Sequence, residues 1–261
     1  MPIITLTTDF GLSDHFTGVM KGVILGIAPR VSIVDISHQV TPFETTEAAF
    51  LIAESYRYFP KKTVHVVVVD PGVGTARRPI LVEAAGQYFL GPDNGVLSMV
   101  YLKQPSTVRE ITNRKLFLGT VSRTFHGRDV FAPVAARLAS GKVKPASVGK
   151  VIQDYLKSHL DLPVRTGTRC WQGCVLKVDR FGNLITSFHI DQFPAVRERP
   201  IVMIPGVAKV EKFIQTYAEG EGSQPAVIVG SSGYLEVVVN QGSAAAALKC
   251  GSGAPVELSI Y

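Results

Sequence analysis

The stretch VHVVVVDPGVGT at residues 64–75 gives the clearest indication of the fold class. Five of its first six residues are valine, and such a β-branched, apolar run is typical of a strand that is buried on both faces of a sheet. Asp70 and two glycines follow at once, so the strand is predicted to end in a tight loop that carries a carboxylate. In α/β proteins, ligands bind at this carboxyl end of the strands.

The residues on either side of this stretch alternate between strand and helix patterns. The predicted strands span residues 3–7, 31–36, 64–69 and 80–83, the predicted helices span 14–27, 44–58 and 129–138, and a turn at 91–95 precedes a further short helix. This alternation predicts an α/β N-terminal domain with a largely parallel sheet, which we assign to residues 1–158.

Beyond Pro163 the pattern changes to short strands that are separated by Gly, Asn or Ser turns. The predicted strands span residues 174–178, 184–188, 201–204, 226–229, 235–239 and 256–260. The sequence RFGN at 180–183 is typical of a hairpin turn. We therefore predict a small C-terminal antiparallel β-barrel domain over residues 168–261.

Composition and charge exclude several classes of protein. Hydrophobic residues make up 46% of the chain and charged residues 18%, which is incompatible with disorder. Since no apolar run approaches the ~18 residues of a membrane span, no membrane partner is expected. The net charge is +6, but the basic residues are scattered, so no nucleic-acid partner is expected either. The three cysteines form no disulfide framework and the start MPIIT has no basic stretch, which together favour a cytoplasmic protein.

Three aspartates are associated with the predicted parallel strands. Asp9 and Asp70 follow the ends of two strands, and Asp35 lies inside another. Each could be a ligand-binding carboxylate, or a residue that caps a helix or forms a turn. Asp14 is equally open, because it could be the N-cap of the helix predicted over 14–27. His126, in TFHGRD at 124–129, precedes a helix and could be structural or functional.

The glycine loop at 69–75 matches neither a Walker loop nor a dinucleotide-binding fingerprint, so no nucleotide cofactor is expected. The sequence also lacks the closely spaced His and Asp pairs that are typical of metal sites. We therefore predict a site without a metal or a cofactor.

Several motifs occur together in one order along the chain. They are TTDFG at 7–11 with Asp14, TPF at 41–43, VDPGVGT at 69–75 with Arg77, TFHGRD at 124–129, DRFGN at 179–183, and SSGYL at 231–235 with Asn240. With these motifs the chain resembles the S-adenosyl-L-methionine (SAM) hydroxide adenosyltransferases, or SAM hydrolases, which are relatives of the fluorinases and chlorinases. The resemblance runs from residue 3 to about residue 260.

This resemblance implies a homotrimer in which the N-terminal domain of one subunit and the C-terminal domain of the next share a site. The implied reaction converts SAM and water into adenosine and L-methionine by attack of water or hydroxide on the ribose C5′ carbon. It implies a catalytic set of Asp70, Arg77 and His126, although the neighbouring Arg78 is an alternative for the arginine.

The implied binding residues divide by the part of SAM that they would contact. Asp9 would bind the ribose hydroxyls. Adenine would be stacked between Phe43 and Tyr217, and its edge would be contacted by Asn183 and the backbone near Gln241. In the methionine part, the ammonium would be bound by Asp179 and Asp14, and the carboxylate by Ser231 and Ser232. Halogenating relatives often carry Arg where this chain has Ser232, so the carboxylate contact differs from theirs.

Three other functions fit parts of this pattern. A non-catalytic adenosine- or SAM-binding protein would keep Asp9 and Asn183 and leave the catalytic set idle. A SAM-dependent halide transferase would share the fold, but the charge of Asp70 beside the nucleophile would disfavour an anion. A metal-dependent phosphohydrolase would need ligands that the sequence does not supply in recognisable pairs.

Overall fold

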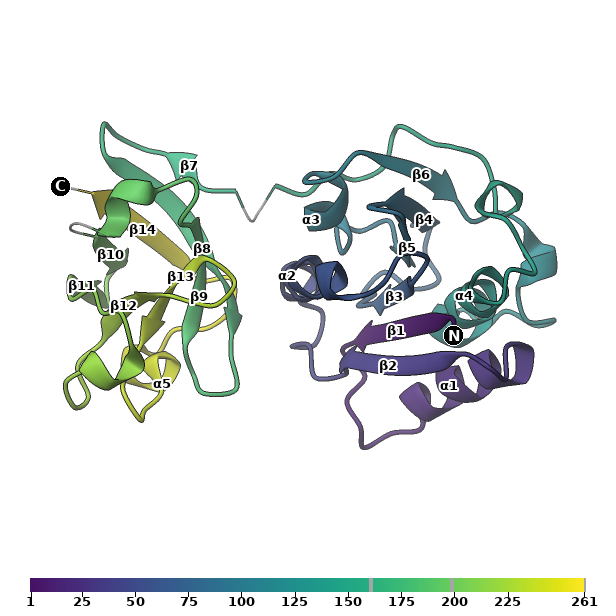
Figure 1. The fold of residues 1–261 in the computed structure, drawn as a ribbon, viewed down its shortest axis with the longest axis horizontal. Helices are drawn as coiled ribbons and strands as arrows, with labels where there is room; N and C mark the ends of the chain where they lie inside the picture. The colour runs from purple at the N-terminus through teal and green to yellow at the C-terminus, as the bar shows by residue number, and fades with distance from the viewer. Residues whose placement is uncertain (160–161, 198–199, 261) are drawn as a thin grey trace. The chain divides into compact units, whose positions relative to one another are not determined.

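The computed structural model describes residues 1–159, 162–197 and 200–260. The chain forms two compact units, Met1–Ser158 and His159–Tyr261, and each has its own sheet and core (Figure 1).

The N-terminal unit is built on a mixed, mostly parallel sheet with the strand order β2-β1-β3-β5-β4-β6. Its strands are β1 (Ile3–Thr8), β2 (Ser32–Ser37), β3 (Val64–Val68), β4 (Pro79–Ala84), β5 (Gln87–Pro92) and β6 (Ser106–Glu110). Its α-helices are α1 (Phe16–Ile27), α2 (Thr45–Ser55), α3 (Ser98–Tyr101) and α4 (Ala132–Ala139), and short 3₁₀ turns lie at Tyr56–Tyr58, Arg114–Leu116 and Pro145–Ser147. The predicted α/β class with a largely parallel sheet is confirmed, because β1, β2, β3 and β5 pair in parallel.

The valine strand β3 is buried on both faces, as its composition predicts. Val66 and Val68 pack into one apolar cluster together with side chains of α1 and α4. Val67 and Val69 point the other way, into a second cluster with side chains of α2 and α3. Two helical layers therefore cover the central strand, which explains why nearly every residue of it is apolar.

Two strands and one helical irregularity were not predicted from the sequence. β5 follows β4 through a tight turn at Ala85 and Gly86 and pairs with it antiparallel, and β6 adds to the far edge of β4. The helix expected over 129–138 begins as a π-helical turn, Gly127–Phe131, and continues as α4. Such π-turns occur frequently at functional sites.

The C-terminal unit is an antiparallel sheet that curls into a nearly closed barrel around one apolar core (Figure 1). Its strands are β7 (Val164–Arg165), β8 (Cys170–Val178), β9 (Leu184–His189), β10 (Pro200–Ile204), β11 (Ala208–Val210), β12 (Ala226–Val229), β13 (Tyr234–Val238) and β14 (Pro255–Ile260). A helix, α5 (Ala244–Leu248), and 3₁₀ turns at Pro194–Arg197 and Tyr217–Glu219 complete it. The predicted antiparallel barrel is confirmed, whereas β7, β11 and α5 were not predicted.

The hairpin turn predicted at 180–183 is formed between β8 and β9. The N–H of Asp179 donates to the carbonyl of Asn183 at 3.0 Å, and the N–H of Gly182 donates to the carbonyl of Asp179 at 3.1 Å. Gly182 has a φ of 86°, and a Cβ there would collide with Ser243, so the turn requires glycine at this position.

Candidate active site

Asp70 lies just beyond the carboxyl end of β3, in a loop that the chain holds rigidly. The N–H of Val73 donates to the Asp70 carbonyl at 3.2 Å, and Thr75 closes a second turn onto Gly72. Gly74 has a φ of 78° and packs so tightly against the carbonyl of Arg123 that a Cβ would collide with it. The loop therefore has little freedom, and the Asp70 carboxylate has a fixed place at the end of the sheet.

Arg77 returns from this loop and binds the Asp70 carboxylate side-on with two hydrogen bonds. Nε donates to Oδ1 at 3.0 Å and Nη2 donates to Oδ2. The two side chains are only 8% and 5% exposed, and the guanidinium lies over the Phe131 ring at 5.7 Å from its centroid. A planar, bidentate pair of this kind fixes the arginine in one orientation.

His126 completes the cluster from the residue that precedes the π-helical turn. Its Nδ1 lies 2.7 Å from Nη2 of Arg77, the same nitrogen that contacts Asp70. Burial lowers the pKa of His126 below its usual value, and the positive charge of Arg77 lowers it further. The imidazole is therefore neutral at neutral pH.

The backbone around His126 is held by buried contacts. Gly127 follows it in a tight space where a Cβ would meet Met20 at 3.1 Å and Phe125 at 3.2 Å. Asp129 is fully buried and accepts hydrogen bonds from the Ser122 N–H at 2.7 Å and from Arg128 Nε at 2.6 Å. These contacts hold the backbone of the TFHGRD motif in place and thereby position the His126 side chain.

One nitrogen of the Arg77 guanidinium makes no hydrogen bond to the described residues. Nε and Nη2 contact Asp70 and His126, but Nη1 is buried and has no hydrogen-bond partner among the residues that the structure describes. An unpaired buried donor is costly unless a ligand or water completes it. Nη1 is thus the donor of this guanidinium that remains without a partner among the described residues.

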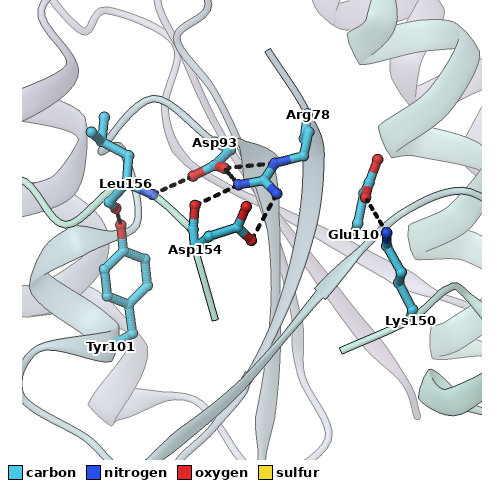
Figure 2. Close-up of polar contacts among 7 residues, drawn as sticks. All are labelled: Arg78, Asp93, Tyr101, Glu110, Lys150, Asp154 and Leu156. Atoms are coloured by element: carbon cyan, nitrogen blue, oxygen red, sulfur yellow. Dashed lines mark hydrogen bonds and ion pairs between the residues drawn. The ribbon is translucent and has the colours of Figure 1, made fainter. Parts of the chain in front are cut away.

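The neighbouring Arg78 forms ion pairs with two other aspartates, away from Asp70 and His126. It donates to Asp93 from Nη2 at 2.8 Å and to Asp154 from Nη1 at 3.0 Å, as Figure 2 shows. Asp93 in turn accepts from the Leu156 N–H at 2.9 Å, so this network ties residues 154–156 to the end of β5. Of the two arginines, the structure brings Arg77 to Asp70 and His126, and gives Arg78 a structural role.

Asp9 follows β1 at the same edge of the sheet and contacts the turn that carries Phe43. Its Oδ2 accepts from the Phe43 N–H at 3.0 Å, and the Phe43 ring is 69% exposed.

Asp14 is exposed, and it is not the N-cap that the sequence allowed, because α1 begins after His15. Asp35 lies in β2 and pairs with Lys21 and His38 instead of capping a helix.

In the C-terminal unit, Asp179 organises the hairpin turn and fixes Asn183. Asp179 Oδ1 accepts from the N–H of Phe181 at 2.8 Å and from that of Asn183 at 2.9 Å, and its Oδ2 accepts from the Asn183 side-chain amide at 2.9 Å. Asn183 is 5% exposed. Its amide nitrogen is thus committed to Asp179, which sets the orientation of its carbonyl oxygen.

A buried acid lies beside the same turn. Glu236 on β13 is 7% exposed, and its Oε2 accepts from the Tyr217 hydroxyl at 3.5 Å. Burial raises the pKa of Glu236 to about 7, and the negative charge of Asp179 adds to the shift. Gly230 makes room for this carboxyl group, since a Cβ at residue 230 would collide with it.

Ser231 and Ser232 lie in the loop Gly230–Gly233 between β12 and β13. The loop is closed by a hydrogen bond from the Gly233 N–H to the Gly230 carbonyl at 2.9 Å. Ser231 is exposed and Ser232 is half-buried. Gln241 follows β13 in a left-handed backbone conformation with a φ of 54°, which is uncommon outside glycine.

The family of the chain follows from its match to family models over both units. Residues 4–149 match the N-terminal domain of the SAM hydroxide adenosyltransferases, and residues 173–257 match the C-terminal domain. The chain belongs to the SAM hydroxide adenosyltransferase family.

Individual relatives agree with this membership. A protein of Salinispora tropica that is named (R)-S-adenosyl-L-methionine hydrolase is 36% identical, over 94% of this chain and 92% of its own length. A crystal structure of a conserved protein from Thermotoga maritima matches with a TM-score of 0.89 at 36% identity, over 98% of this chain and 99% of that one. A fluorinase from an Actinoplanes species is more distant, at 27% identity over 92% of this chain.

As a member of this family, the chain gathers its predicted site residues into three groups, two in the N-terminal unit and one in the C-terminal unit. Asp70, Arg77 and His126 meet in one cluster of the N-terminal unit, and Asp9 and Phe43 meet in another. In the C-terminal unit Asp179 contacts Asn183, while no side-chain hydrogen bond or ion pair joins Asp14, Ser231, Ser232 or Gln241 to any of these groups among the described residues.

Sequence reasoning missed Glu236 and Phe131. A signal for Glu236 was present, because a lone acid inside the apolar run YLEVVV at 234–239 is unusual for a buried strand.

Within the described ranges, no cluster of three His, Cys, Asp or Glu side chains is arranged to hold a metal ion. None of the described helices is long and apolar enough to cross a membrane.

Proposed function

We propose that this chain hydrolyses SAM to adenosine and L-methionine, with water or hydroxide as the nucleophile at the ribose C5′ carbon. The observation that carries the proposal is the buried guanidinium of Arg77, which holds Asp70 and His126 and keeps Nη1 free of protein partners among the described residues. The name SAM hydrolase of relatives at 36% identity supports it.

The protonation of the cluster favours a hydroxide-like nucleophile. A guanidinium has no acceptor, so Arg77 must donate to Nδ1 of His126, and the neutral imidazole then carries its proton on Nε2. Both Nη1 of Arg77 and Nε2 of His126 are therefore donors. Preorganised donors in a buried site stabilise an oxygen that carries negative charge.

The reaction balances without a general acid. The nucleophile's oxygen forms a bond to C5′, the C5′–S bond breaks, and its electron pair goes to sulfur. The sulfonium thereby becomes the neutral thioether of methionine. The proton of the attacking water leaves to solvent or to Asp70, whose carboxylate oxygens keep unused lone pairs beside Arg77.

The remaining predicted residues would hold the substrate. Asp9 would accept hydrogen bonds from the ribose hydroxyls, and Phe43 and Tyr217 offer exposed rings for adenine. The other proposed contacts are Asn183 and the backbone at Gln241 for the adenine edge, Asp179 and Asp14 for the ammonium, and Ser231 and Ser232 for the carboxylate.

Halide transfer is the second candidate, since fluorinases are relatives. The expectation that Asp70 repels an anion is weaker than the sequence alone indicates, because Arg77 offsets its charge in a bidentate pair. The products decide between the two functions. With SAM and excess chloride, we expect adenosine and no 5′-chloro product.

We further propose that the enzyme is a cytoplasmic homotrimer. The residues proposed to bind one substrate are divided between the units, since Asp9 and Asp70 lie in one and Asn183 and Tyr217 lie in the other. If neighbouring subunits share the site, reassembly of Asp70→Ala chains with Asn183→Ala chains should restore some activity. An active monomer, or two inactive parents that show no recovery, would contradict this arrangement.

Hydrolysis in ¹⁸O-labelled water tests the reaction itself. We expect the label in the 5′-hydroxyl of adenosine and none in methionine, and we expect turnover to continue in EDTA. Intact SAM after prolonged incubation would indicate a binding protein. Methylthioadenosine or free adenine would show that a different bond is broken.

A further inference from the structure

The turn that presents Phe43 has a backbone that is unusual for an aromatic residue. The N–H of Glu44 donates to the carbonyl of Thr41 at 3.0 Å, which closes a β-turn with Pro42 and Phe43 at its centre. Phe43 has a φ of 71°. Pro followed by a residue with positive φ is the pattern of a type II turn, in which glycine or asparagine normally takes the second central position.

Packing within the chain does not explain this conformation. A left-handed conformation is unfavourable for a residue other than glycine. The Phe43 ring is 69% exposed, so it recovers little of that cost by burial. Strained residues of this kind occur where the surrounding structure holds them for a functional reason.

Asp9 supplies the contact that holds Phe43. The residues that precede Pro42 are held by two other hydrogen bonds. The Thr41 N–H donates to the buried Glu47 at 3.2 Å, and the Val40 N–H donates to the Thr8 carbonyl at 3.3 Å. At Phe43 itself, the N–H donates to Oδ2 of Asp9 at 3.0 Å. This is a charge-assisted hydrogen bond to the residue that has the strained φ.

We propose that Asp9 is the positioning residue for Phe43 in addition to binding the ribose. Oδ2 holds the turn that presents the ring, and Oδ1 is left for the ligand. The inference rests on the proposed function for the identity of the ligand, whereas the positioning itself does not depend on it. One consequence is that recognition of the ribose and of the base are coupled through a single carboxylate.

Removal of Asp9 should therefore weaken binding of the base as well as of the ribose. The decisive probe is 2′,3′-dideoxyadenosine, which has the base but lacks the hydroxyls that Asp9 would bind. We expect Asp9→Ala to lower its affinity about tenfold by calorimetry, as the loss of one hydrogen bond to a charged group predicts. Asp9→Asn keeps an oxygen that can accept from the Phe43 N–H, so it should weaken adenosine but leave dideoxyadenosine close to wild type.

Phe43→Gly provides the matched background, because glycine adopts a positive φ without strain and has no ring to orient. In that background, Asp9→Ala should no longer change the affinity for dideoxyadenosine. Hydrogen exchange at the amide of residue 43 gives a readout without ligand, and it should be faster in Asp9→Ala than in wild type or Asp9→Asn.

Equal affinity of wild type and Asp9→Ala for dideoxyadenosine would overturn the inference, and so would unchanged protection of the Phe43 amide. Failure of the proposed function looks different. In that case the wild-type protein would leave SAM intact, whether or not it binds the nucleosides, while amide exchange would still report whether Asp9 holds the turn.

Discussion

Nη2 of Arg77 lies 2.7 Å from Nδ1 of His126. Because arginine can only donate, this distance assigns the acceptor role to Nδ1 and places the imidazole proton on Nε2. The histidine is therefore oriented as a donor by an arginine that is itself locked onto Asp70.

The two adjacent arginines should separate into a catalytic and a structural residue. Arg77→Lys loses the fork that joins Asp70 and His126, and we expect kcat to fall by ~10²–10³-fold, as for removal of a preorganised donor. Arg78→Lys is the matched control, because it disturbs the contacts to Asp93 and Asp154 that Figure 2 shows. It should lower the melting temperature and leave kcat near wild type, and the reverse result would exchange the two roles.

Activity should fall on the acid side because of His126. Burial and the charge of Arg77 lower the pKa of His126 below its ordinary 6.5, so the ring is neutral above that pKa. Protonation puts a hydrogen on Nδ1, opposite the guanidinium donor, and separates the pair. We expect kcat/KM to be flat near neutral pH and to fall through a midpoint below 6.5. A midpoint above 6.5, or an unchanged acid limb in His126→Gln, would contradict the assignment.

The stability of the C-terminal unit should depend on pH through Glu236. Burial and the charge of Asp179 raise the pKa of Glu236 from 4.5 to about 7, and Tyr217 donates to it. Between these two values the unfolded chain loses the proton and the folded chain keeps it. The stability gained from the neutral carboxyl is thus complete below pH 4.5 and is lost as pH rises through about 7.

Glu236→Gln tests this dependence, because glutamine is similar in shape and stays neutral. Relative to wild type, its melting temperature should be higher at pH 8 than at pH 5, by a few degrees. Melting temperatures measured at the two pH values give the answer. Parallel pH curves for the two proteins would show that Glu236 does not titrate in this range.

Gly230 should be indispensable only while Glu236 is present. A Cβ at residue 230 would occupy the place of the Glu236 carboxyl group, so Gly230→Ala should destabilise the protein by ~1–3 kcal/mol, which chemical denaturation can measure. In a Glu236→Ala background the same substitution should cost far less. Gly251→Ala is the control, since a Cβ there meets nothing within 4 Å. Equal losses in both backgrounds would refute the steric explanation.

The N-terminal sheet was predictable where composition reflects burial on both faces. The run of valines in β3 places alternate side chains in two different cores, and only apolar residues satisfy both. β5 was harder to predict, because QYFLGP ends in Gly and Pro, which are typical of a turn. Its antiparallel partner β4 supplies hydrogen bonds that a local pattern does not contain.

The candidate site divides in the same way. The order of the motifs was sufficient to predict the family, and the strand patterns placed Asp9 and Asp70 at strand ends, because residue type and spacing along the chain carry this information. The choice between Arg77 and Arg78 required the folded structure, since the two residues are adjacent in sequence and are distinguished by contacts to His126 and to Asp154, which lie far away along the chain. The folded structure alone revealed the left-handed Phe43 held by Asp9 and the Glu236 carboxyl lodged against Gly230. A backbone angle and a steric fit depend on long-range contacts, which no local pattern of residues specifies.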